Sequence, residues 1–79
     1  MEEVTYIFRV KGMDCVSCDQ IMKKDLLDLS YVKSVEIDVS TKTVSITGDF
    51  NGIPENILAE DLTILLSPHG YEFFVLEDQ

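Results

Sequence analysis

The sequence is short of three features, and each shortage excludes a class of protein. It has two cysteines, whereas a small secreted protein held together by disulfides normally has several pairs. Its six basic residues stand against fifteen acidic ones, and the formal charge of −9 repels the phosphates of nucleic acids and of anionic lipids. No apolar run approaches the roughly 18 residues that would span a bilayer. A disulfide scaffold, a nucleic-acid or membrane-surface partner and a transmembrane segment are therefore disfavoured.

The length of 79 residues predicts one domain, residues 1–79. The start of the chain is acidic, unlike the basic start of a secretory signal. One closely spaced pair of cysteines in such a chain is typical of a reducing compartment and of a metal or redox site. We therefore expect a cytoplasmic location, either as a free protein or as a domain of a membrane protein.

The spacing of apolar residues predicts six secondary-structure elements. Apolar and polar residues alternate in the strands and repeat every three to four residues in the helices, and Asp14 is placed to cap the first helix. In chain order we expect a strand at 5–10, a helix at about 16–29, strands at 35–39 and 44–46, a helix within 55–67 and a strand at 71–76. The buried side of the second helix is expected to consist of Leu58, Leu62, Leu65 and Leu66. This order predicts an α+β fold of the ferredoxin-like βαββαβ type, an antiparallel four-stranded sheet with two helices on one face.

The segment from Gly12 to Cys18 carries the clearest chemical signal. Cys15 and Cys18 lie three residues apart at the expected start of the first helix, so their sulfurs can turn toward one point. The free N–H groups and the positive end of the helix favour thiolates, which bind soft or borderline ions such as Cu(I), Zn(II) and Cd(II). Two sulfurs leave the ion open to ligands from another protein, so the pair favours transfer over storage.

A dithiol oxidoreductase of the thioredoxin or glutaredoxin type is the main alternative for these cysteines. Such a domain also has Cys-x-x-Cys after its first strand, but it continues with a strand–helix unit and then a strand that contains proline. Here a hairpin expected over residues 32–47 occupies that stretch, and Pro54 follows it. The order of elements therefore disfavours the redox hypothesis. No set of acid, base and nucleophile points to a hydrolytic enzyme.

Several motifs together resemble the heavy-metal-associated domain, a family that includes small cytoplasmic copper chaperones, N-terminal domains of metal-pumping P-type ATPases and mercury-binding domains. They are, in order, Gly12-Met13-x-Cys15-x-x-Cys18, Met22, Leu26, Leu29, Val32, Val35, Ile37 and Gly70-Tyr71. The resemblance implies a monomeric, non-enzymatic domain that binds one heavy-metal ion and exchanges it with a metallochaperone or with other domains of an ATPase. Cys15 and Cys18 would be the metal ligands. Met13 would point inward and anchor the loop, and Tyr71 would lie beside the site and shield it, although both also fit as core residues.

Two features differ from the common copper-binding members of this family. Asp14 precedes the first cysteine where copper domains usually have Thr or His, and in this it resembles zinc-, cadmium- and lead-exporting ATPases. Its carboxylate would suit a mixed-ligand zinc site, although a helix cap explains the same residue. Ser67-Pro68-His69 replaces a helical turn that the family usually has, and His69 is either an added ligand or an exposed cap at the helix end.

The favoured hypothesis is a cytoplasmic domain of a Zn(II)- or Cd(II)-type metal-transporting P-type ATPase. A Cu(I)-binding ATPase domain or a free copper chaperone, with two sulfur ligands only, is the alternative. The acidic charge favours a domain that receives metal from a basic chaperone, with Asp14, Asp19 and Asp61 expected near the site.

Overall fold

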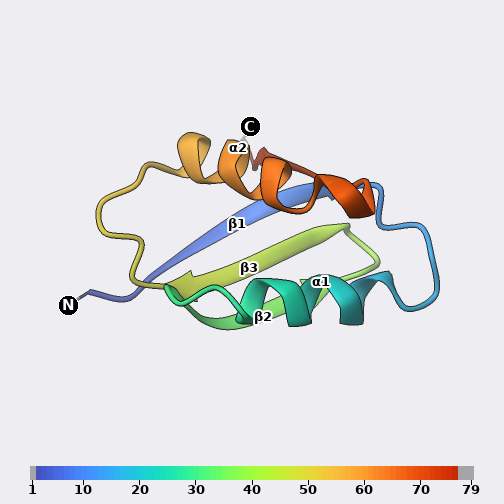
Figure 1. Ribbon diagram of the computed structural model, residues 1–79, viewed down its shortest axis with the longest axis horizontal. Helices are drawn as coiled ribbons and strands as arrows, with labels where there is room; N and C mark the ends of the chain where they lie inside the picture. The colour runs from blue at the N-terminus through green and yellow to red at the C-terminus, as the bar shows by residue number, and fades with distance from the viewer. Residues whose placement is uncertain (1, 77–79) are drawn as a thin grey trace.

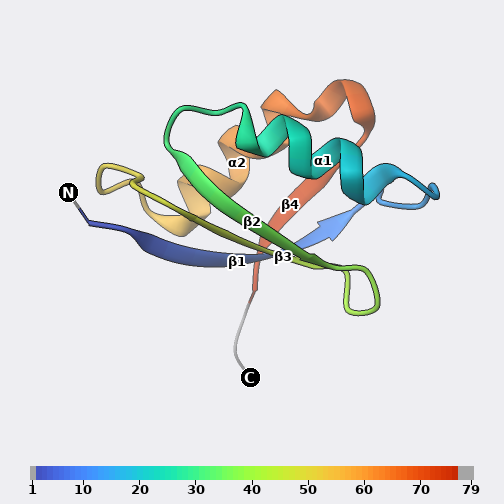
Figure 2. The same cartoon turned by 90° about the horizontal axis from the view of Figure 1, so that it is seen from below.

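The computed structural model describes residues 2–76, and these have the predicted order of strands and helices. The elements are β1 (Val4–Lys11), α1 (Cys18–Leu27), β2 (Val32–Asp38), β3 (Thr43–Gly48), α2 (Glu55–Leu65), the short 3-10 helix η1 (Ser67–His69) and β4 (Glu72–Val75). The strands form one antiparallel sheet in the order β2-β3-β1-β4, and both α-helices cover the same face of it (Figures 1 and 2). The predicted ferredoxin-like fold is therefore confirmed. Within this described part of the chain, no helix is long and apolar enough to cross a membrane.

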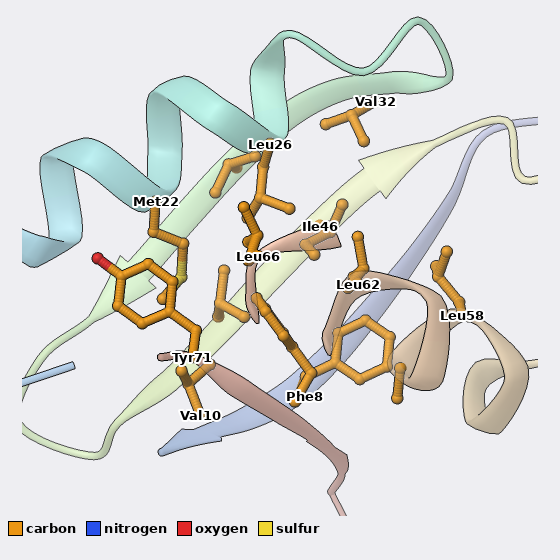
Figure 3. Packing of buried hydrophobic residues seen from close by; sticks show 14 of the residues in the cluster. Phe8, Val10, Met22, Leu26, Val32, Ile46, Leu58, Leu62, Leu66 and Tyr71 are labelled. Carbon is orange, nitrogen blue, oxygen red and sulfur yellow. The ribbon is translucent and has the colours of Figure 1, made fainter. Parts of the chain in front are cut away.

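The hydrophobic core lies between the sheet and the two helices, because each element presents one apolar side to it (Figure 3). Phe8 and Val10 of β1 point from the covered face of the sheet toward Met22 and Leu26 of α1, and all four are almost completely buried. Residues four apart in a helix lie one turn above each other, which explains the spacing of the two α1 residues. Burial of each large apolar side chain stabilises the fold by about 1.5–3 kcal/mol relative to an exposed position.

The second helix is rotated slightly from the orientation that its leucines predict. Three of the four predicted leucines are buried, but Leu65 is half-exposed and Ala59 is buried instead. The cause is Thr63, whose hydroxyl accepts a hydrogen bond of 2.9 Å from the backbone N–H of Phe73 in β4. Thr63 lies one turn after Ala59, so this bond draws their shared side of the helix toward the sheet and leaves Leu65 at the edge.

The turn before Gly70 also differs from the prediction. The sequence suggests that residues 67–69 depart from the family by replacing its usual helical turn, but they form η1, in which His69 N–H donates to the carbonyl of Leu66 and Gly70 N–H donates to that of Ser67. Pro68 has no N–H to satisfy, so it fits the first turn of this helix. Gly70 ends η1 with a φ of +81°, in the left-handed region. Residues 67–69 therefore form a helical turn themselves, and the expectation that they replace one was wrong.

Three connections meet at one end of the sheet. Lys11, the last residue of β1, lies opposite Glu72, the first residue of β4. The N–H of Val10 donates a hydrogen bond of 2.8 Å to the carbonyl of Lys42, which joins the end of β1 to the turn of the β2–β3 hairpin. The β1–α1 loop, the β2–β3 turn and the η1–β4 junction therefore lie together.

Aromatic side chains pack against one another at the opposite end of the sheet. The ring of Tyr6 stacks on that of Phe50 with centroids 5.1 Å apart, and Tyr31 packs edge-on against Phe50. The hydroxyl of Tyr6 donates a hydrogen bond of 2.9 Å to the carbonyl of Ile53. These contacts fix the loop between β3 and α2, far from the cysteines.

Candidate metal site

The candidate site lies in the loop that joins β1 to α1, residues 12–17. Gly12 has a φ of +94°, and a side chain at this position would collide with the carbonyl oxygen of Gly70. The side chain of Met13 is buried in the core, as the family resemblance implies. Glycine therefore lets the loop pass against the η1–β4 junction, and Met13 anchors it while the following residues stay at the surface.

Cys15 and Cys18 are joined by a disulfide, with their Cα atoms 5.2 Å apart. Their spacing predicts that the two sulfurs turn toward one point, and the structure places them there. Cys18 is the first residue of α1, which begins two residues later than predicted, and it is only 8% exposed. Cys15 is exposed in the loop. The pair thus has one cysteine fixed in the core and one at the surface.

Reduction of this disulfide by two electrons and two protons would give two thiols at the N-terminal end of α1. The N–H groups of the first turn and the helix dipole stabilise negative charge at that end. The N–H of Cys15, 3.2 Å from Sγ of Cys18, adds a further donor. These effects favour thiolates, which are ligands for soft or borderline ions. The donor set therefore fits a heavy-metal ion.

Tyr71 lies directly beside Cys18. Its hydroxyl donates a hydrogen bond of 3.0 Å to the backbone carbonyl of Cys18, and the residue is 2% exposed. Figure 3 shows the hydroxyl reaching toward α1. Burial, followed by the carboxylates of Asp25 and Asp19, raises the pKa of this hydroxyl above its usual value. Tyr71 is therefore a core residue that also contacts Cys18, and its role in shielding a metal ion stays a prediction.

Asp14 does not cap the helix that follows it. Ser17 occupies the N-cap position of α1 without a hydrogen bond from its side chain, so the capping prediction for Asp14 was wrong. The carboxylate of Asp14 is three residues before the N-cap, and it faces the β2–β3 turn, where Nζ of Lys42 lies 3.9 Å from its Oδ1. The side chain of Asp14 is 80% exposed. It is therefore a surface group next to the cysteines that pairs with a lysine.

His69 pairs with a residue in the last turn of α1. Its Nε2 lies 2.9 Å from Oδ2 of Asp25, and its ring stacks on Tyr71 with centroids 5.7 Å apart. Asp25 follows Cys18 by seven residues, which is about 10 Å along the helix. Among residues 2–76, no three His, Cys, Asp or Glu side chains come together as a group that could hold a metal. The structure brings the two cysteines together without Asp14 or His69, and metal ligation by either of these stays a prediction.

Lys42 is the residue near the site that the sequence analysis missed. The predicted topology could have placed Lys42 there, because β3 begins where β1 ends and the hairpin turn must then lie beside the cysteine loop.

Asp61 was expected near the site but lies elsewhere. It lies near Tyr31, which follows the C-terminal end of α1. Burial, and then the carboxylate of Asp61, raises the pKa of Tyr31. The expectation that Asp61 lies near the cysteines was therefore wrong, whereas Asp19 does lie near Tyr71.

The sequence matches the model of the heavy-metal-associated domain over residues 7–72. Oxidized MerP from Ralstonia metallidurans CH34 superposes with a TM-score of 0.77 at 24% identity, covering 96% of this chain and 100% of that one. The yeast copper transporter domain Ccc2a gives 0.72 at 23% identity, covering 95% and 97%. The N-terminal domain of a potential copper-translocating P-type ATPase from Bacillus subtilis gives 0.73 at 20% identity, covering 99% and 92%. At these identities the structural likeness shows a shared fold, and the comparison with curated proteins found no match.

Proposed function

The chain belongs to the heavy-metal-associated domain family, and from this premise we propose that it binds one soft or borderline heavy-metal ion through Cys15 and Cys18 and transfers it to another protein. The observation that carries the proposal is the position of the two sulfurs, which meet at the start of α1 with Cys15 exposed. The reduced thiolates would hold the ion from one side and leave the other side open to the ligands of a partner. Domains of this family are metal-binding modules, which supports a carrier over an enzyme.

The oxidoreductase alternative has less support. The fold is ferredoxin-like, with the β2–β3 hairpin in the place where a thioredoxin-like domain would have a strand–helix unit. A disulfide between the cysteines is compatible with either function, because a metal-binding dithiol can also be oxidised. Turnover of a small disulfide substrate by the metal-free protein would support the alternative.

Two classes of ion remain as candidates. Asp14 next to Cys15 supports the Zn(II)/Cd(II)-type ATPase domain, because a carboxylate is a common third ligand of zinc. The ion pair of Asp14 with Lys42 and the lack of a three-residue ligand group in residues 2–76 support the second candidate. This is a Cu(I)-binding ATPase domain or a free copper chaperone that uses the two sulfurs alone.

The distribution of charge supports a basic protein partner. All six Lys and Arg residues lie at or before Lys42, so α2, η1 and β4 have no Lys or Arg, and α2 and β4 carry acidic groups. Such a surface attracts a metallochaperone or an ATPase domain with a basic face, and it repels nucleic acid and anionic membranes. We further propose that residues 1–79 form one domain that acts as a monomer in the cytoplasm.

The test is metal binding by the reduced protein under anaerobic conditions. Equilibrium dialysis should show about one equivalent of Zn(II) or Cu(I) for the unsubstituted protein and none for the variant with Cys15→Ser and Cys18→Ser. A single Cys15→Ser variant should bind much more weakly, because one thiolate remains. Stoichiometric binding by the double variant, with its fold verified by circular dichroism, would refute the proposal.

A further inference from the structure

We propose that Lys42 sets the preference of the site between metal ions: by pairing with Asp14 it disfavours divalent ions such as Zn(II) relative to Cu(I). This inference rests on the proposed function, because it assigns a role to a residue beside the two cysteines. Lys42 lies in the β2–β3 turn, outside the cysteine motif, and reaches the site only through the fold.

The turn that carries Lys42 is held in place from both sides. Oδ1 of Asp38 accepts hydrogen bonds from the backbone N–H groups of Ser40 at 3.0 Å and Thr41 at 3.3 Å. The carbonyl of Lys42 accepts the N–H of Val10 at 2.8 Å, and the backbone of Lys42 has a left-handed φ of +59°. The lysine backbone is therefore fixed beside the cysteine loop, and only its side chain has to be ordered for the pair to form.

The position of the ammonium group affects the two classes of ion differently. Nζ of Lys42 lies 3.9 Å from Oδ1 of Asp14, and Asp14 is the neighbour of Cys15 in the chain. A zinc site built on two thiolates takes further ligands to reach four, and Lys42 competes for the adjacent carboxylate. Cu(I) is satisfied by soft sulfur ligands and does not need this carboxylate.

The formal charge of Lys42 also favours Cu(I) over Zn(II). Two thiolates with Cu(I) form an anion, which a nearby ammonium group stabilises, whereas two thiolates with Zn(II) form a neutral complex. Both partners of the ion pair are largely exposed, so water screens the interaction, and exposed pairs of this kind change an equilibrium by up to about fivefold. The effect of Lys42 should therefore be a shift in relative affinity, with the cysteines still required for either ion.

The test compares the affinities of the reduced protein for Zn(II) and for Cu(I), each measured by competition with a chromophoric chelator of that ion. Lys42→Met should raise the ratio of Zn(II) to Cu(I) affinity about two- to fivefold, and Lys42→Arg should leave it close to that of the unsubstituted protein. Lys33→Met is a matched control, because Lys33 forms an exposed ion pair with Glu3, at 2.6 Å, near the opposite end of β1. It removes the same charge and should leave the ratio unchanged.

A second set of variants tests whether Lys42 acts through Asp14. In the background of Asp14→Asn, the change produced by Lys42→Met should become smaller, because only the effect of the formal charge of Lys42 on the complex remains, and a double-mutant cycle measures this difference directly. An unchanged ratio in Lys42→Met, an equal rise in Lys33→Met, or the same rise with Asp14→Asn present would each overturn the role of Lys42 and leave the cysteine site standing. Failure of the unsubstituted reduced protein to bind either ion would instead overturn the proposed function.

Discussion

The hydroxyl of Tyr71 donates a hydrogen bond of 3.0 Å to the backbone carbonyl of Cys18. This bond ties the η1–β4 junction to the first turn of α1. Because both Tyr71 and Cys18 are buried, the same contact supports the core and fixes the backbone of one proposed metal ligand.

Replacement of Tyr71 by Phe should lower the free energy of unfolding by about 1 kcal/mol, because it removes one buried hydrogen bond and keeps the ring. Urea unfolding measures this loss. The same variant should release bound metal to a chelator more rapidly than the unsubstituted protein, since the backbone of Cys18 is less firmly held.

Tyr6 provides the control for this prediction. Its hydroxyl donates a hydrogen bond of 2.9 Å to the carbonyl of Ile53 at the other end of the molecule. Tyr6→Phe should therefore lower stability to a similar degree and leave the rate of metal release unchanged. Equal acceleration in both variants would show that Tyr71 acts only through overall stability.

The raised pKa of Tyr71 predicts a loss of stability in alkaline solution. The folded protein holds this phenolic proton more tightly than the unfolded chain, in which a tyrosine has its ordinary pKa of 10.0. The resulting stabilisation is complete below pH 10.0 and is lost as the pH rises through the raised pKa. Tyr31, whose pKa is raised by burial and by Asp61, contributes in the same sense. The free energy of unfolding, measured against pH in urea, should fall in this range, and the fall should be shallower in Tyr71→Phe. An equally steep fall in that variant would contradict the assignment to Tyr71.

Gly12→Ala should destabilise the fold by more than the roughly 1 kcal/mol that a positive φ alone costs a non-glycine residue. Gly12 has a φ of +94°, and the added methyl group would also meet the carbonyl oxygen of Gly70. Gly52→Ala is the comparison, because Gly52 has a φ of +80° with no atom within 4 Å of the added carbon. Thermal unfolding of the two variants should therefore show a larger drop for Gly12→Ala. Equal drops would mean that the loop can move away from Gly70 without loss.

The fold and the cysteine pair could be predicted because they depend on local patterns. Alternation in the strands and the three-to-four residue period in the helices fix the order of elements, and the Cys-x-x-Cys spacing places both sulfurs at the start of α1. The errors concern contacts between distant segments. Leu65 is exposed because Thr63 bonds to Phe73 of β4, and Asp14 pairs with Lys42 of the hairpin turn instead of capping α1. Neither partner can be identified from periodicity, because each is set by the way the elements pack.

The absence of Lys and Arg beyond Lys42 makes the molecule an electric dipole, because α2 and β4 carry acidic side chains and no Lys or Arg. A cationic protein approaching through solution would feel a torque before any contact forms, and the dipole would bias which side it meets first. At higher ionic strength this long-range orientation fades within a few ångströms of the surface, so collisions would become less selective while the short-range fit stayed the same.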